Sequence, residues 1–281
     1  MSQANVAVTV AAASRRLCLL ATVKSDLGIS GSGSDTKLNR LIVAASLTLA
    51  GPEGLNRDPW LQTYLEKMPG PDGIYLRPTH WPIQSITSIT SGTGSSPSTV
   101  TGSTYSVRGD RRTVYRVNEW ARTGWDTTPR LTGARALEYN VTYLAGWVMP
   151  DQATEWAAAT AFAASSWAKA TDDDEPFVFQ MDATGVTTGS TEPTWPTVSG
   201  GTVTEESQTW TAYDQRLPQP IEEAAIITVI DWFRGGLDIP AGIASEGGEG
   251  WRIVYRDGVS GLSVPLAAQS LCRPYREPLA A

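Results

Sequence analysis

The side chains of this chain that could perform acid–base, nucleophilic or metal chemistry are few, and their spacing suits none of the three. The chain has one histidine, His80, and two cysteines, Cys18 and Cys272, which lie near opposite ends of its 281 residues. A zinc site needs clustered Cys and His ligands, and a catalytic triad would need His80 beside an activated serine, for which no motif is present. The two carboxylates of a glycosidase have no characteristic sequence motif, and nothing in this sequence points to such a pair. We therefore predict no enzymatic activity and no cofactor.

Aromatic side chains are the other candidates for a binding site, because the chain contains eleven tryptophans. Phe162 and Trp195 lie in a segment rich in Thr, Gly and Trp, and aromatic rings can stack on a sugar. The alternative is that these two rings form the small core of that segment. The acidic run 172–175 could hold a divalent cation through its oxygen atoms, or it could be a solvated loop; no ligand spacing favours the cation.

Composition limits the partners. A net charge of −7 argues against general nucleic-acid binding, which needs a basic surface, but it suits a channel through which DNA slides. The apolar run Leu17–Ala21 is too short to cross a bilayer, so no membrane partner is expected. We expect residues 1–13 to be a weakly ordered arm, or an arm ordered only by a neighbour. Two isolated thiols are typical of a reducing compartment, with a disulfide as the alternative.

Two helices are predicted to organise the chain. In residues 35–50, five apolar side chains repeat at the spacing of one helical face, Ser34 or Asp35 can cap the first turn, and Gly51-Pro52 ends the helix. A short helical turn that carries Lys24 precedes it. The second helix, 221–233, begins after Pro218-Gln-Pro220 and is apolar around most of its circumference, so we expect it to pack between neighbours.

Short strands are predicted between and after the helices. They cover residues 74–76, 82–90, 105–107, 113–117 and 137–143, with a final hairpin formed by 251–255 and 259–264. Alternation is clearest in 137–143. The isoleucines of 82–90 recur every third position, which a bulge or a twist of the strand would reconcile. Residues 56–68 are predicted to be irregular or a short helix.

Three phrases resemble, in the same order, those of the head–tail connector (adaptor) proteins of tailed bacteriophages. They are the Lys-bearing turn with the helix of 35–50, the Pro-x-x-Ser-Ile-Thr-Ser-Ile strand, and a Val-Thr-Tyr-x-Ala-Gly-Trp strand. Residues 270–276 resemble the short ending of the same proteins. The matching positions are Lys24, Leu27, Ile29, Asp35, Leu38, Leu41, Ile42, Ala44, Ala45, Ser46, Pro82, Ser85, Ile86, Thr87, Ser88, Ile89, Val141, Thr142, Tyr143, Ala145, Gly146 and Trp147.

A segment between residues 151 and 216 interrupts this resemblance. Its phrases, of which Thr191–Pro196 is the most specific, resemble a small β module of virion and tail proteins that is similar to chitin-binding-type modules. The module's usual Gly-Asp is replaced here by Ser165-Ser166. We expect this inserted module to fold separately and to point outward.

The resemblance implies an α+β fold: a helical adaptor core with antiparallel β segments and an extended C-terminal tail, plus an inserted small all-β module. The expected parts are an arm (1–13), the core (14–150 and 217–265), the module (151–216) and the tail (266–281). The helices are expected to pack the subunits through Leu38, Leu41, Ile42, Ala45, Leu49, Ile221, Ala224, Ile227 and Trp232. The tail is expected to dock on the portal through Leu271, Arg273, Pro274, Tyr275 and Arg276, with a frayed tail as the alternative.

The function that the resemblance implies is structural. Such a protein forms a homo-oligomeric ring, commonly of twelve copies, beneath the portal protein, extends the DNA channel and joins head to tail. Its further partners would be a stopper, head-completion or tail neck protein, and genomic DNA that passes without sequence specificity. It would be made in the host cytoplasm and reside in the virion neck. The competing hypothesis is a carbohydrate-binding virion or tail decoration protein that acts through the inserted module, with Phe162 and Trp195 on the sugar.

Overall fold

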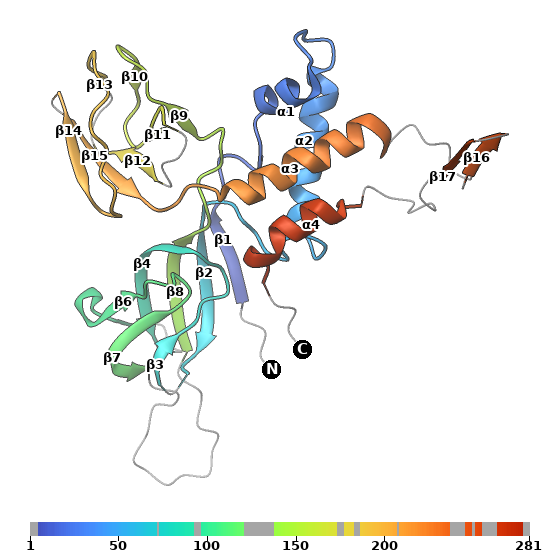
Figure 1. Cartoon of the computed structure of the whole chain (residues 1–281). Coiled ribbons are helices and arrows are strands. Elements are labelled where there is room, and N and C mark those ends of the chain that lie inside the picture. The colour runs from blue at the N-terminus through green and yellow to red at the C-terminus, as the bar shows by residue number, and fades with distance from the viewer. Residues whose placement is uncertain are drawn as a thin grey trace, which may run out of the picture. The chain divides into compact units, whose positions relative to one another are not determined.

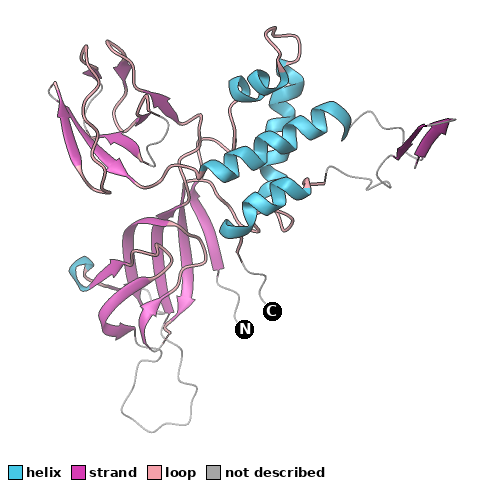
Figure 2. Ribbon diagram, viewed as in Figure 1, coloured by secondary structure: helices cyan, strands magenta, loops and turns pink. Residues whose placement is uncertain are grey.

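Strands dominate the computed structural model of this chain (Figure 1, Figure 2). The structure describes residues 5–71, 73–92, 97–120, 138–172, 177–182, 186–206, 208–236, 245–248, 251–254 and 263–277. About 34% of the described residues are strand, and within them three sheets have three or more strands, against four short α-helices. The prediction of a helical adaptor core with a small β insertion is therefore wrong, because strands build most of the expected core as well as the insertion.

Contacts divide the chain into two compact units. The first unit consists of Met1–Ala13 and Trp60–Trp147, and the second of Ser14–Pro59 and Val148–Ala281. The second unit contains both the helices and the segment that was expected to be an inserted module. Among the helices described, none is long and apolar enough to cross a membrane.

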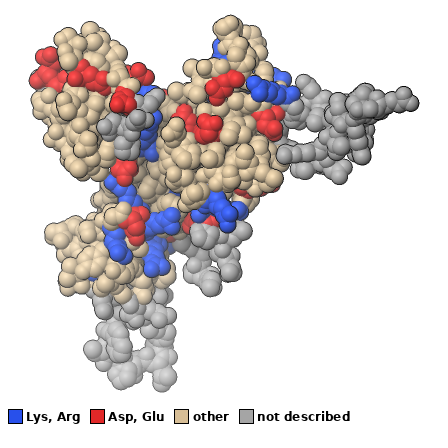
Figure 3. Space-filling view, in the orientation of Figure 1, with Lys and Arg blue, Asp and Glu red and all other residues tan. Residues whose placement is uncertain are grey.

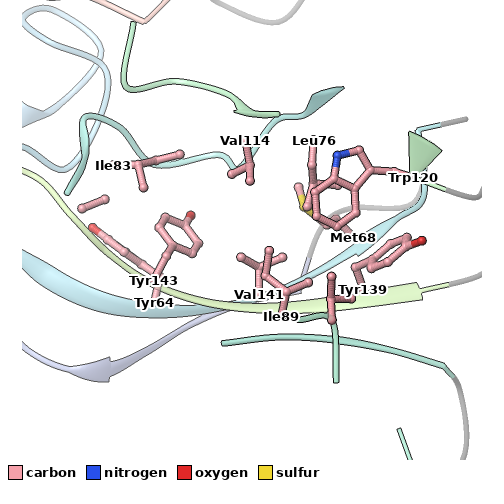
Figure 4. Close-up of a cluster of buried hydrophobic side chains, with 12 residues drawn as sticks. Tyr64, Met68, Leu76, Ile83, Ile89, Val114, Trp120, Tyr139, Val141 and Tyr143 are labelled. Carbon is pink, nitrogen blue, oxygen red and sulfur yellow. The ribbon is translucent and has the colours of Figure 1, made fainter. Parts of the chain in front are cut away.

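The first unit is built from two antiparallel sheets. One has the order β1-β2-β8-β4-β5, formed by β1 (Asn5–Val10), β2 (Gln62–Pro69), β8 (Glu138–Ala145), β4 (Ile83–Ser91) and β5 (Ser98–Thr99). The other has the order β3-β7-β6, formed by β3 (Gly73–Leu76), β7 (Val114–Trp120) and β6 (Tyr105–Val107), which a 3₁₀ turn, Gly102–Thr104, precedes. Side chains of both sheets share one core (Figure 4): Tyr64, Met68, Leu76, Ile83, Ile89, Val100, Val114, Trp120, Tyr139, Val141, Tyr143 and Ala145.

The burial pattern of β8 and the irregular pairing of β4 can be compared with the sequence pattern of each strand. Strand β8 alternates buried and less buried residues as predicted, and Leu137 lies outside the described residues. Strand β4 pairs with β8 with register shifts at Ile83/Ser85 and Ile86/Ser88. These irregularities bring Ile83 and Ile89 into the core and Ile86 against it, although the three residues are spaced by three. Of the two predicted explanations, the strand irregularity of a bulge is the one that the pairing shows.

Two segments of the first unit differ from prediction. Residues 62–69 form β2, not a helix or an irregular segment, and they bury Gln62, Tyr64, Glu66 and Met68 in strand alternation. Residues 5–10 form β1, which pairs antiparallel with β2. The expectation of a weakly ordered arm is therefore wrong for these residues, because β2 supplies hydrogen bonds that the arm alone could not make.

Helices of the second unit come from both ends of the chain. They are α1 (Leu20–Leu27), α2 (Asp35–Ala50), α3 (Gln219–Asp231), with a π-helical turn at Trp232–Gly236, and α4 (Leu266–Cys272), with a 3₁₀ turn at Arg273–Tyr275. The bounds of α2 are as predicted, and Gly51 is its C-terminal cap. Helix α3 contacts α1, α2 and α4. This central position explains why its apolar residues surround it.

The rest of the second unit is β structure. Strands β9 (Ala153–Glu155), β11 (Trp167–Lys169), β12 (Val178–Met181), β15 (Gln208–Tyr213) and β14 (Thr202–Glu205) form a five-stranded sheet, and β10 (Ala161–Phe162) pairs with β13 (Val186–Thr187). A hairpin pairs β16 (Ser245–Gly248) with β17 (Trp251–Val254). The predicted partner of 251–255 was 259–264; the observed partner precedes it, and residues 255–262 lie outside the described part of the chain.

Candidate functional site

The residues that were predicted to pack the subunits lie largely between the helices of one chain. Leu38, Leu41, Ile42, Ala45, Leu49, Ile221, Ala224 and Trp232 are buried, and Ile227 is half-buried. The indole Nε1 of Trp232 also donates to the carbonyl oxygen of Ser263 at 3.0 Å. These side chains hold the helices of one subunit together, so any contact with a second copy must use the outward faces of the same helices.

Three polar residues of the adaptor-like phrases fix the N-terminal helices. The Lys24 ammonium lies 2.7 Å from the Asp35 carboxylate, a bridge between α1 and the first turn of α2. Ser34 is the N-cap of α2, but its side chain makes no capping hydrogen bond, so that part of the capping prediction is wrong. Ser46 is fully buried: its hydroxyl accepts from the Leu17 N–H at 3.0 Å and donates to the Ile42 carbonyl at 2.7 Å. The serine of the phrase thus anchors the segment before α1.

The C-terminal segment folds onto its own chain. Helix α4 packs on α3 and buries Ala268 and Cys272. Beyond it, the Glu277 N–H donates to the Leu55 carbonyl at 2.9 Å, and the Arg276 guanidinium donates to the Pro52 carbonyl. The prediction of an extended tail is wrong, since α3 offers an apolar surface that the tail covers.

The residues predicted for portal docking differ in exposure within this folded tail. Arg273, Pro274 and Arg276 are exposed, whereas Leu271 and Tyr275 are half-buried. Some of the side chains predicted as anchors therefore pack partly against the chain itself, and the others face the solvent. The exposed members can meet a partner without unfolding of α4, although Arg276 also donates to the Pro52 carbonyl.

Removal of residues 271–281 should destabilise the second unit. The deletion removes the buried Cys272 side chain and the hydrogen bonds that Arg276 and Glu277 make to residues 52–56. We expect a loss of about 2–5 kcal/mol in the free energy of unfolding. Urea unfolding followed by tryptophan fluorescence measures it, and deletion of 278–281 alone is the control. An unchanged midpoint would contradict the account of the tail.

Both cysteines are free and buried, and no disulfide joins them. Burial, with a smaller contribution from the Glu222 charge, raises the pKa of Cys18 to about 12, and burial raises the pKa of Cys272 to about 11. Both thiols are therefore protonated at neutral pH.

A thiol whose pKa is raised in the folded state stabilises the fold fully below its unfolded pKa and loses this contribution as pH rises toward the folded value. The loss for Cys18 and Cys272 should begin near pH 9, their ordinary value. We expect no reaction with a thiol reagent at pH 8 in the folded protein and reaction of two thiols in urea. The midpoint should fall more steeply between pH 9 and 11 in the wild type than in Cys18→Ala. Rapid labelling of the folded chain would contradict this.

The aromatic residues predicted for sugar stacking lie in the core of the β module. Phe162 is 5% exposed and meets Trp210 edge to face at 5.3 Å between ring centroids. The Trp195 ring stacks on Phe179 at 4.0 Å and touches the edge of Trp210. Since Phe162 has no exposed face and one face of Trp195 is covered, the geometry favours the core interpretation over the glycan site.

Carboxylates explain two features of this module. The Trp195 Nε1 donates to Glu192 at 2.7 Å, which accounts for the spacing within the Thr191–Pro196 phrase. Partial burial works against ionisation of Glu192, but hydrogen bonds from Thr171 and Trp195 outweigh it and lower its pKa. Glu205 is nearly buried and accepts from Trp156 Nε1 at 3.1 Å, Trp210 Nε1 at 3.0 Å and the Gly189 N–H at 2.9 Å. Both groups are structural.

A buried polar network in the first unit was not predicted. Glu66 is fully buried between the sheets; one carboxylate oxygen accepts from the Tyr143 hydroxyl at 2.7 Å and the Thr79 N–H at 2.9 Å, and the other from the Thr79 hydroxyl at 2.7 Å. Burial, with the Glu66 charge as the next cause, raises the pKa of Tyr143, which stays protonated. His80 stacks on Tyr64 at 3.9 Å. The lone histidine thus belongs to this network.

Within the described ranges, no group of three or more Cys, His, Asp or Glu side chains could hold a metal ion. Of the acidic run, residues 173–175 lie outside those ranges, so the choice between a cation loop and a solvated loop stays open. No protein-family model matches the chain, and no curated protein matches it. Function is therefore inferred from the residues and their geometry.

Proposed function

We propose that this chain is a structural component of a tailed-phage virion, a head–tail connector of the adaptor type. What supports the proposal most is that polar and glycine residues of two of the three adaptor-like phrases lie at contacts between distant segments. Lys24 pairs with Asp35, Ser46 bonds the segment before α1, and Gly146 lies where β4, β8 and the segment before β2 meet. The proposal concerns function and does not require a mainly helical core.

The proposed action is association. Copies of the chain form a ring below the portal, extend the channel for DNA and receive the next neck protein. The net charge of −7 suits a lumen that DNA must leave freely. The exposed tail residues Arg273, Pro274 and Arg276 are the proposed contacts with the portal.

Co-sedimentation with portal rings tests this proposal. The full-length chain should migrate with the portal protein of the phage that encodes it, and Arg273→Glu should weaken this association without lowering the melting temperature. Asp26→Arg, a charge change at another exposed helical position, serves as the control. A chain that never migrates with the portal would contradict the proposed function.

The second candidate, a carbohydrate-binding decoration protein, has less support from the geometry. Its predicted stacking residues pack against Trp210 and Phe179 instead of lining a surface. Strong binding to chitin beads that Trp195→Ala abolishes, in a chain that makes no portal contact, would favour this second function.

A further inference from the structure

Helix α2 presents an outward face that mixes apolar and basic groups. Val43 is 38% and Leu47 48% exposed, unusually high for aliphatic side chains on a helix that otherwise packs well. Arg40 is also exposed and lies one turn before Val43. Because residues at i, i+3 and i+7 share one side of a helix, the three side chains form one line, the α2 stripe (Arg40, Val43, Leu47).

Helix α3 has a corresponding outward face. Glu223 is exposed, and Ile227 and Ile230 are half-buried, although the other sides of this helix are covered. Positions i, i+4 and i+7 again share one side, so these residues form the α3 stripe (Glu223, Ile227, Ile230). Exposed Asp231 lies at its C-terminal end and adds a second negative charge.

The two stripes belong to two helices that pack against each other. Helix α3 packs on α2, as Figure 1 shows, and each helix buries the side that faces the other. Their exposed sides therefore point away from that contact. Both acidic and basic groups are visible over the helical part of the molecule in Figure 3.

Length, order and charge of the stripes are complementary. Each runs from a charged residue through two aliphatic ones over seven residues, about 10 Å of helix at 1.5 Å per residue. Aligned in parallel, Arg40 of one copy would face Glu223 of another, Val43 would face Ile227, and Leu47 would face Ile230. Among the described residues, neither Arg40 nor Glu223 has an ion-pair partner, unlike Lys24 with Asp35 and Lys169 with Glu155.

We infer that the α2 stripe of one copy docks on the α3 stripe of the next copy. The contact joins two different patches, so it is heterologous, and repetition with a suitable rotation closes a ring. The closed ring rests on the proposed function, whereas the pairwise contact can be measured without it. A neck protein seated on either stripe would be the other occupant, and the test separates the two.

Charge exchange between the stripes is the test. In the full-length chain, Arg40→Glu places two acidic groups opposite each other, and Glu223→Arg places two basic groups there, so each variant should self-associate at least about tenfold more weakly than the wild type. An equimolar mixture should recover association, because Glu at 40 then meets Arg at 223, and Arg40 meets Glu223. Mixed assemblies should alternate and contain even numbers of copies by native mass spectrometry.

Sedimentation velocity gives the result, with Asp26→Arg as the matched control and melting temperatures to show that every variant folds. The inference is overturned if the wild-type chain stays monomeric at about 1 mM, if either single variant associates like the wild type, or if the mixture remains as weak as the variants alone. Assembly through another face would overturn only this contact. Absence of the chain from the virion neck would overturn the proposed function instead.

Discussion

Gly146→Ala should prevent stable folding of the first unit. Gly146 has φ +109°, a region that L-residues rarely adopt, and a Cβ atom there would lie 2.0 Å from the Trp60 carbonyl oxygen and 2.4 Å from its carbon. Backbone occupies the space, so no side-chain rotation relieves the clash. We expect a loss of about 4 kcal/mol or more in the free energy of unfolding, or recovery of the chain only in aggregates.

Neighbouring hydrogen bonds explain why the backbone cannot move aside. The Gly146 N–H donates to the Pro82 carbonyl at 3.0 Å, Gln84 Nε2 donates to the Gly146 carbonyl at 2.7 Å, and the Leu61 N–H donates to the Trp147 carbonyl at 3.0 Å. Gly28→Ala is the matched control: Gly28 also has a positive φ, +68°, but its Cβ would meet nothing within 4 Å. This variant should lose only about 1–2 kcal/mol. Equal stability of Gly146→Ala and the wild type in urea would refute the account of this junction.

Glu66→Ala should also destabilise the first unit strongly. The carboxylate satisfies three donors from Thr79 and Tyr143 at a site with no solvent exposure. Without it, buried donors lose their acceptor, and each such loss costs about 1–3 kcal/mol. We expect the free energy of unfolding to fall by about 3–5 kcal/mol, measured by urea titration.

Two variants separate the hydrogen bonds from the volume of Glu66. Tyr143→Phe removes one donor and should cost about 1–2 kcal/mol. Glu138→Ala, at an exposed position in β8, should change stability by no more than about 0.5 kcal/mol. If Glu66→Ala matched Glu138→Ala, the network would contribute nothing to the fold.

Sequence patterns predicted the elements whose periodicity was undisturbed. The apolar face of α2 and the alternation of β8 were sufficient to predict these two elements, because each element buries one side. Strand β2 was missed because Tyr64 and Leu65, with Trp60 and Leu61 four residues earlier, imitate helical spacing, while inward-facing Glu66 breaks the apolar alternation. The hydrogen-bond partners of Glu66 come from separate segments of the chain, so no local sequence pattern predicts them.

The tail shows a different limit of sequence reasoning. Leu271 and Tyr275 were predicted to be contact residues, but composition does not say whether a contact lies within the chain or with a partner. The structure supplies α3 as the surface that buries Cys272. The sequence likewise did not say whether Trp195 contacts a sugar or its own chain. In the structure it contacts its own chain, through Glu192 and Phe179.

The position of this chain in the virion tests the central claim most directly. Purified particles of the phage that we propose encodes the chain would be labelled with gold-conjugated antibody against the chain and examined by electron microscopy. The account predicts label confined to the neck, between capsid and tail, in every intact particle. Label on the capsid surface or the tail fibres, or particles that lack the chain altogether, would contradict it.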